Sequence, residues 1–144
     1  MTRSIVLGTA VLLVSAVMTV SAQAAAPGEW DGSCGGYGTE NPFRDVCDVN
    51  ADLANADEGS GYIGSCEDGG RCDDSVENKL STAQAKVMAG KYVDAVEKIC
   101  TIISDANMWA DTGKKKKLTD EGRDELVGAA AILAASIIPG ATCQ

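Results

Sequence analysis

Four consecutive lysines form the densest cluster of chemically active side chains in this 144-residue chain. The chain carries a formal net charge of −9, so these ammonium groups stand out in an acidic protein. Such a cluster can bind the carboxylate or sulfate groups of a polysaccharide, or the headgroups of anionic lipids. A solvated loop that only keeps the chain soluble explains the same residues. The candidate polysaccharide-binding residues are Lys114, Lys115, Lys116 and Lys117.

An acidic segment with oxygen ligands at alternate positions is the candidate metal site. Its first residues have the spacing of positions 1, 3 and 5 of a calcium-binding loop. Leu53 and Gly59 then occupy the places where an EF-hand loop requires glycine and glutamate, so the segment is not an EF-hand. A short helix over residues 43–56 or an acidic loop explains the same residues. A weak calcium site is the alternative, with ligands Asp48, Asn50, Asp52 and Asp57.

Composition excludes several classes of protein. The chain has no histidine, which excludes Ser-His-Asp triads, Cys-His dyads and histidine-bound zinc. Its acidic balance argues against nucleic-acid binding, because phosphate contacts need a basic surface. Paired carboxylates for glycoside hydrolysis would need a cleft that so small a chain has little material to build. We therefore expect a protein that is not an enzyme, with no cofactor except possible calcium.

The six cysteines predict three disulfides, because an even number of cysteines after a secretory signal is typical of disulfide-bonded proteins. The chain lacks a Cys-x-x-Cys pair, which disfavours zinc and redox chemistry. The sequence does not choose among the possible pairings. Of these we favour Cys34–Cys47, Cys66–Cys72 and Cys100–Cys143.

Residues 1–24 are predicted to be a signal peptide. Arg3 supplies a positive start, Ile5–Val20 is apolar, and Ala22–Ala24 forms an Ala-x-Ala cleavage site. The apolar stretch is shorter than the roughly 20 residues of a membrane span. We expect cleavage before Ala25, no transmembrane span in the mature chain, and a secreted, periplasmic or cell-surface bacterial protein.

Residues 25–74 differ in character from the rest of the mature chain. They carry twelve acidic side chains against two arginines and have few large aliphatic residues. Such a segment needs crosslinks or a bound ion to fold. We expect an irregular, disulfide-rich acidic segment. Its aromatic residues form either a small core or a surface that stacks on sugar rings, and they are Trp30, Tyr37, Phe43 and Tyr62.

Residues 75–138 have apolar residues at helical spacing and predict three helices. Asp74 is the expected N-cap of the first, which Gly90 ends; Thr119 is the expected N-cap of the third, which Pro139 ends. Short connections predict a small antiparallel three-helix bundle, followed by a tail over residues 139–144. The predicted apolar stripes are Val76, Leu80, Ala83 and Val87, then Tyr92, Ala95, Ile99, Ile102, Ala106 and Trp109, then Leu126, Ala130, Leu133 and Ile137.

This helical part resembles the FIMAH module, a short helical domain found near the C-termini of secreted bacterial proteins. The resemblance covers about half of the mature chain. Departures from the pattern are Ile99, Ile102 and Ile103 in place of Leu and Phe, the unusual Cys100, and extra residues around the lysines. The resemblance implies attachment to glycosaminoglycan-type polysaccharides. The residues that carry it are Ser75-Val76, Lys79-Leu80, Ala83, Ala89–Tyr92 with Ala95, Gly113-Lys114, Lys117–Thr119, Leu126-Val127 and Ala129-Ala130.

Residues 89–92 are also similar to the turn of a tetratricopeptide repeat, but a repeat protein needs further copies and the chain has no second one. The leading hypothesis is therefore non-catalytic attachment to an extracellular polysaccharide through the lysine cluster. The first alternative is a cell-surface protein–protein interaction or assembly subunit, which amphipathic helices and spare cysteines would support. The second is a weak calcium-dependent structural module. The oligomeric state is left open.

Overall fold

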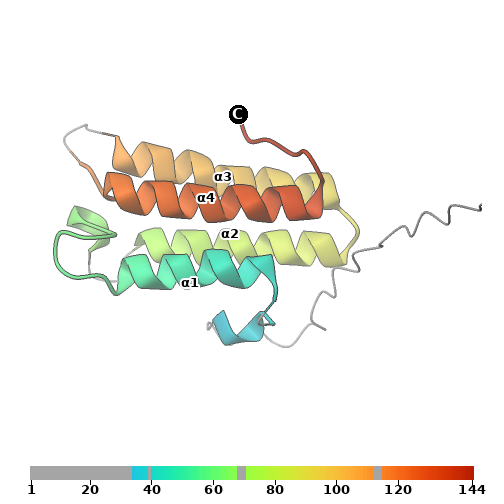
Figure 1. Ribbon diagram of the computed structural model, residues 1–144, viewed down its shortest axis with the longest axis horizontal. Helices are drawn as coiled ribbons and strands as arrows, with labels where there is room; N and C mark the ends of the chain where they lie inside the picture. Colours follow the sequence, from blue (N-terminus) through green and yellow to red (C-terminus); the bar gives the residue numbers. More distant parts are fainter. Residues whose placement is uncertain (1–33, 39, 68–70, 112–114) are drawn as a thin grey trace, which may run out of the picture.

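The computed structural model describes residues 34–38, 40–67, 71–111 and 115–144, and these are mainly helical (Figure 1). The predicted fold class, mainly α with disulfides, is confirmed. The predicted signal peptide lies outside the described residues. The helices are the 3-10 helix η1 (Cys34–Gly36), α1 (Pro42–Ala54), the 3-10 helix η2 (Gly64–Cys66), α2 (Arg71–Met88), α3 (Tyr92–Ala110) and α4 (Asp120–Ile137).

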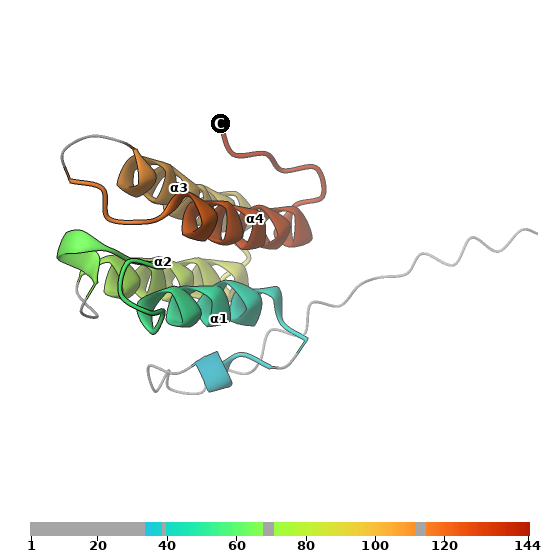
Figure 2. The same cartoon turned by 60° about the vertical axis from the view of Figure 1, so that its left-hand side comes forward.

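The four α-helices form an antiparallel bundle. Each helix packs against two others in a closed order, α1 on α2, α2 on α3, α3 on α4 and α4 on α1. Figures 1 and 2 show α1 and α2 in one layer and α3 and α4 in the other. Successive helices run in opposite directions, which gives the up-down-up-down topology of a four-helix bundle.

Helix α1 lies in the segment that we expected to be irregular and adds a fourth helix to the expected three. It agrees with the short helix over residues 43–56 that is one explanation of the acidic segment. The side chain of Asn41 caps its start by accepting a hydrogen bond from the Phe43 amide at 3.1 Å. Pro42 follows at the first helical position, where its missing N–H costs nothing. A buried face then completes the helix, formed by Phe43, Val46, Cys47, Asn50 and Leu53.

The ends of the other helices agree with the prediction at three places and differ at one. Helix α4 ends at Ile137, just before Pro139. Gly90 has a φ of 72° and directly follows α2, as a left-handed C-terminal residue does. The Thr119 side chain accepts a hydrogen bond from the Gly122 amide at 3.1 Å and caps α4. Helix α2 begins at Arg71, so Asp74 lies within its first turn and is not the N-cap.

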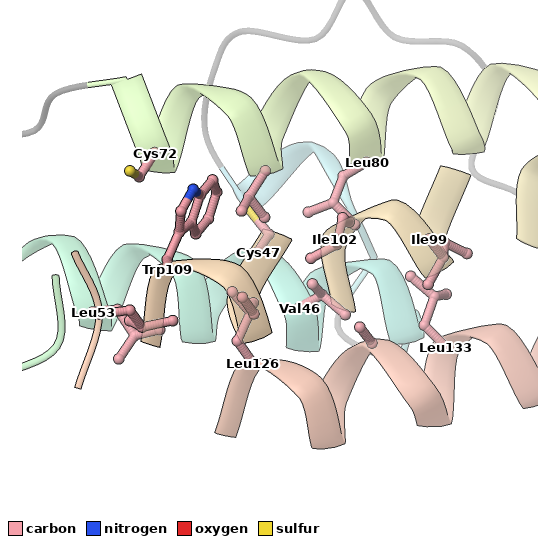
Figure 3. Packing of buried hydrophobic residues seen from close by; sticks show 14 of the residues in the cluster. Val46, Cys47, Leu53, Cys72, Leu80, Ile99, Ile102, Trp109, Leu126 and Leu133 are labelled. Atoms are coloured by element: carbon pink, nitrogen blue, oxygen red, sulfur yellow. The ribbon is translucent and has the colours of Figure 1, made fainter. Parts of the chain in front are cut away.

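The core lies between the two layers and contains most of the predicted apolar stripes (Figure 3). Ala83, Ala95, Ala106 and Ala130 are fully buried, and their small side chains let the helices approach closely. Val87 and Ile137 are partly buried at the edge of the core. Tyr92, predicted to belong to the stripe of α3, is instead half exposed at the end of the bundle. The largest fully buried aliphatic side chains are Leu80, Ile99, Ile102, Leu118, Leu126 and Leu133.

The three disulfides have the favoured pairing. Cys34–Cys47 joins η1 to α1, Cys66–Cys72 joins η2 to α2, and Cys100–Cys143 joins α3 to the C-terminal tail. No cysteine is left free, so the spare cysteines expected for an assembly subunit are absent.

Candidate functional site

The lysine segment lies between α3 and α4, at one end of the bundle. Lys114 lies outside the described residues, and residues 115–117 lead into the buried Leu118. The amides of Lys117 and Leu118 both donate to the Trp109 carbonyl, at 2.8 and 3.2 Å. The Lys117 carbonyl accepts from the Ile63 amide at 2.9 Å. The backbone of this segment is therefore held from both sides.

A short β-bridge completes this support. Tyr62 and Leu118 pair in antiparallel fashion, and the Thr119 amide donates to the Gly61 carbonyl at 3.0 Å. Gly61 has a φ of 62°, and a Cβ there would lie 2.4 Å from the Leu53 carbonyl oxygen. The close approach of this loop to the end of α1 thus needs glycine at this position.

The described lysine side chains differ in their surroundings. Lys115 is exposed, and Lys117 is half-buried. The Lys116 ammonium lies 3.0 Å from the Asp120 carboxylate, and its hydrogen bond and charge lower the pKa of Asp120. Such an exposed ion pair contributes little stability. Lys116 can therefore exchange Asp120 for an anionic ligand at low cost.

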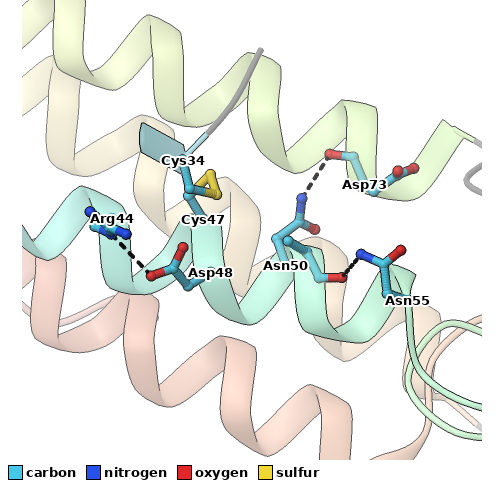
Figure 4. Close-up of a disulfide and its surroundings, with 8 residues drawn as sticks. Cys34, Arg44, Cys47, Asp48, Asn50, Asn55 and Asp73 are labelled. Carbon is cyan, nitrogen blue, oxygen red and sulfur yellow. Dashed lines mark hydrogen bonds and ion pairs between the residues drawn. A yellow bond between two sulfur atoms is a disulfide. The ribbon is translucent and has the colours of Figure 1, made fainter. Parts of the chain in front are cut away.

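The predicted calcium ligands are not brought together. Three of them lie on α1, where residues two apart project in nearly opposite directions. Asp48 faces Arg44, with 3.3 Å between carboxylate and guanidinium, whereas Asn50 points into the core (Figure 4). Asp52 and Asp57 are exposed. Within the described ranges, no group of three or more His, Cys, Asp or Glu side chains could hold a metal ion.

Asn50 has a structural role that sequence reasoning missed. It is 1% exposed, its Oδ1 accepts from the Tyr62 hydroxyl at 2.6 Å, and its Nδ2 donates to the Asp73 carbonyl at 3.3 Å. One side chain thus connects α1, the loop after it and α2. On the same helix, burial raises the pKa of Glu77, and the negative charges of Asp73 and Asp74 raise it further.

Three of the four predicted aromatic residues are described by the structure, and these are buried in the core and do not form a surface for sugar rings. Tyr37 and Phe43 are buried and stacked with ring centroids 5.9 Å apart. Tyr62 meets Trp109 edge to face at 6.1 Å. Burial, together with the charge of Glu77, raises the pKa of Tyr37 to about 12. The fourth aromatic residue of the prediction, Trp30, lies outside the described residues.

A polar hollow of about 490 Å³ on the outer surface of α2 and α3 is a site that the sequence analysis did not predict. Lys79 lies in it, and its ammonium donates to the Ser75 hydroxyl and, at 2.7 Å, to the Asp105 carboxylate of α3. The signal was present in the sequence as polar residues at spacings of three and four, on the side of α2 opposite its buried stripe. The lining residues are Arg71, Asp74, Ser75, Asn78, Lys79, Thr82 and Lys98.

A second hollow, of about 390 Å³, lies between α3 and the C-terminal tail that Cys143 ties to it. Val93, Val96 and Ile138 give it apolar walls. Near it, at the turn between α2 and α3, Met88, Tyr92 and Val93 are 42%, 51% and 63% exposed. These side chains form an exposed apolar end of the bundle.

The helices of the described chain include none that is both long enough and apolar enough to cross a membrane. In comparisons with protein-family models, with curated proteins and with solved structures, none matches this chain.

Proposed function

We propose that this protein is a secreted, non-catalytic binding module for an anionic extracellular polysaccharide, and that Lys114–Lys117 supply the main contacts. The observation that carries the proposal is the backbone support of this segment, in which Trp109 and Ile63 hold Lys117 from two sides. Side chains on a fixed backbone lose less conformational freedom when a ligand binds. The resemblance to the FIMAH module and the position of the lysines in an otherwise acidic protein support the same ligand class.

Three intrachain disulfides are compatible with an oxidising, non-cytoplasmic compartment, where such bonds persist. This supports the secreted location that residues 1–24 suggest. A polyanionic polymer can also contact several ammonium groups at once, so weak individual contacts add up. These properties suit attachment to a polymer better than capture of a small molecule.

The test compares two double variants that remove the same charge. Lys115→Ala with Lys117→Ala removes two cations of the segment, whereas Lys86→Ala with Lys91→Ala removes one cation from the last turn of α2 and one from the turn before α3. Binding of the disulfide-bonded protein to immobilised polygalacturonate and to a neutral galactan is measured across a salt series. We expect selective binding to the acidic polymer, weaker with salt, and reduced about tenfold by the first variant alone.

Equal losses in the two double variants would show only a general charge effect and would refute the assignment to the lysine segment. The variant that replaces all four lysines of Lys114–Lys117 extends the test to Lys114. If this variant binds polygalacturonate as well as the unchanged protein does, the proposed function fails at this site.

A second candidate function is a protein–protein interaction or assembly subunit. The observation in its favour is the exposed apolar end of the bundle formed by Met88, Tyr92 and Val93. Sedimentation across a concentration series tests it. A stable oligomer that Val93→Ser dissociates would favour this function, whereas a monomer at all concentrations would count against self-assembly.

A further inference from the structure

The hollow between α2 and α3 has the chemistry of a site for an acidic sugar. Its walls offer hydroxyl and amide groups on Ser75, Asn78 and Thr82, and cations on Arg71 and Lys98. These groups can donate to sugar hydroxyls and to a carboxylate, and the cations form the stronger, charge-assisted bonds. The lining contains no aromatic side chain, so recognition there depends on hydrogen bonds and charge.

Within the part of the chain that the structure describes, two cations of the hollow have no ion-pair partner. The Lys79–Asp105 pair is partly buried, with exposed fractions of 23% and 25%, and it joins the two helices at the floor of the hollow. Asp74 is the one carboxylate in the lining. Among the ion pairs of the described residues, none involves Arg71 or Lys98. An acidic sugar can therefore contact them without breaking an existing pair there.

The hollow is long enough for more than one sugar unit. Its lining on α2 extends from Arg71 to Thr82, which corresponds to about 16 Å along a helix that rises 1.5 Å per residue. Its Arg71 end lies at the end of the bundle where α3 ends and the lysine segment begins (Figure 1). A long acidic chain has two places to bind on one protein, and a short one fits the hollow alone.

We infer that the hollow on α2 and α3 is a second binding site for a carboxylate-bearing sugar, in which Arg71 and Lys98 contact the carboxylate and Ser75, Asn78 and Thr82 contact the hydroxyls. This inference rests on the proposed function, because it takes the class of polymer from it. The residues of the second site are separate from the lysine segment. The two sites together explain how a protein with a net charge of −9 holds a polyanion. Two linked contacts bind more tightly than either alone.

The test uses trigalacturonate as the probe and the backbone amide NMR spectrum of the disulfide-bonded protein as the readout. We expect trigalacturonate to shift the amides of the hollow on α2 and α3. Lys98→Ala should weaken its binding about threefold to tenfold, because it removes one charge-assisted contact at a solvent-exposed site. Lys91→Ala is the matched control, since it removes an equal charge from an exposed lysine that directly precedes α3 at the far end of the bundle.

Several outcomes separate this inference from the proposed function. Shifts confined to residues 115–120, or equal weakening by Lys98→Ala and Lys91→Ala, overturn the second site and leave the proposed function intact. Trigalacturonate binding that survives Lys115→Ala with Lys117→Ala, while polymer binding is lost, supports two separate sites. Tight binding of neutral trigalactose overturns the carboxylate assignment, and no shift with trigalacturonate overturns the inference. Far-UV circular dichroism checks that each variant is folded.

Discussion

Replacement of Asn50 tests whether this residue holds the bundle together or binds calcium. Its two hydrogen bonds reach Tyr62 in the loop after α1 and the carbonyl of Asp73 in α2 (Figure 4 shows the second). Asn50→Ala removes both and leaves the hydroxyl of Tyr62, a residue that is 2% exposed, without this acceptor. Burial already raises the pKa of this hydroxyl above its usual range, and the negative charges of Asp73 and Glu77 raise it further.

The expected loss of stability follows from these contacts. A buried polar group left without a partner costs about 1–3 kcal/mol, and the truncated side chain adds a small cavity. We therefore expect Asn50→Ala to lower the free energy of unfolding by about 2–4 kcal/mol. Tyr62→Phe should cost about 1–2 kcal/mol, because the Oδ1 atom of Asn50 loses its donor. The double variant should cost about 1–2 kcal/mol less than the sum, because the two residues share one hydrogen bond.

Equilibrium urea unfolding of the four proteins measures these values. Asn55→Ala is the control, because Asn55 is an exposed asparagine at the end of α1 whose amide donates to the Ala51 carbonyl at 2.8 Å. It should cost less than about 1 kcal/mol. Strict additivity of Asn50→Ala and Tyr62→Phe, or equal losses in Asn50→Ala and Asn55→Ala, would refute the buried hydrogen bond. A rise in melting temperature with calcium that Asn50→Ala abolishes would restore the calcium hypothesis.

Three further predictions concern stability. Replacing the Cys100–Cys143 disulfide by two alanines should lower the free energy of unfolding in urea by about 4 kcal/mol, the value for a loop of 43 residues. The same replacement of Cys34–Cys47, which closes a loop of 13 residues, should cost less. A larger loss for Cys34–Cys47 would contradict this prediction. Gly61→Ala should cost at least about 2 kcal/mol, because the new Cβ meets a backbone oxygen, and a melting temperature within about 2 °C of the unchanged protein would argue against that contact. Burial raises the pKa of Glu77 above its ordinary 4.5, so the folded state binds this proton more tightly and the associated stability is lost as pH rises above 4.5 through the raised pKa. Glu77→Gln should therefore raise the melting temperature at pH 7 and flatten its dependence on pH just above 4.5, and an unchanged pH profile would refute the effect.

The helices after residue 70 could be predicted because their stripes follow ordinary helical rules. Ile99 and Ile102, for example, are regularly spaced aliphatic residues on one face of α3. Helix α1 is only one of several explanations of its segment under the same rules, because its buried face includes Asn50 and a disulfide cysteine among acidic neighbours. Only the Tyr62 hydroxyl and the Asp73 carbonyl make an asparagine acceptable there, and both come from other elements.

Of the candidate site, too, one part could be predicted from the sequence and another part could not. The lysine cluster is visible in the sequence because its members are consecutive. Its support by Trp109 and Ile63 comes from residues on both sides of it in space, and no local pattern indicates that. The polar hollow requires Lys98 of α3 to lie beside the polar side chains of α2, which depends on how the two helices are aligned. The spacing within one helix shows a polar face but not what lies across from it.

The arrangement of the three disulfides affects how the molecule responds to a single cut in its chain. Two of them close within residues 34–72 and the third closes within residues 100–143, so no covalent bridge connects the α1–α2 pair with the α3–α4 pair. A protease that cuts the exposed turn at Gly90 would leave two fragments joined only by non-covalent contacts. The fragments would separate in denaturant without any reductant. The same arrangement lets the first pair of helices complete its crosslinks before the second pair has been synthesised.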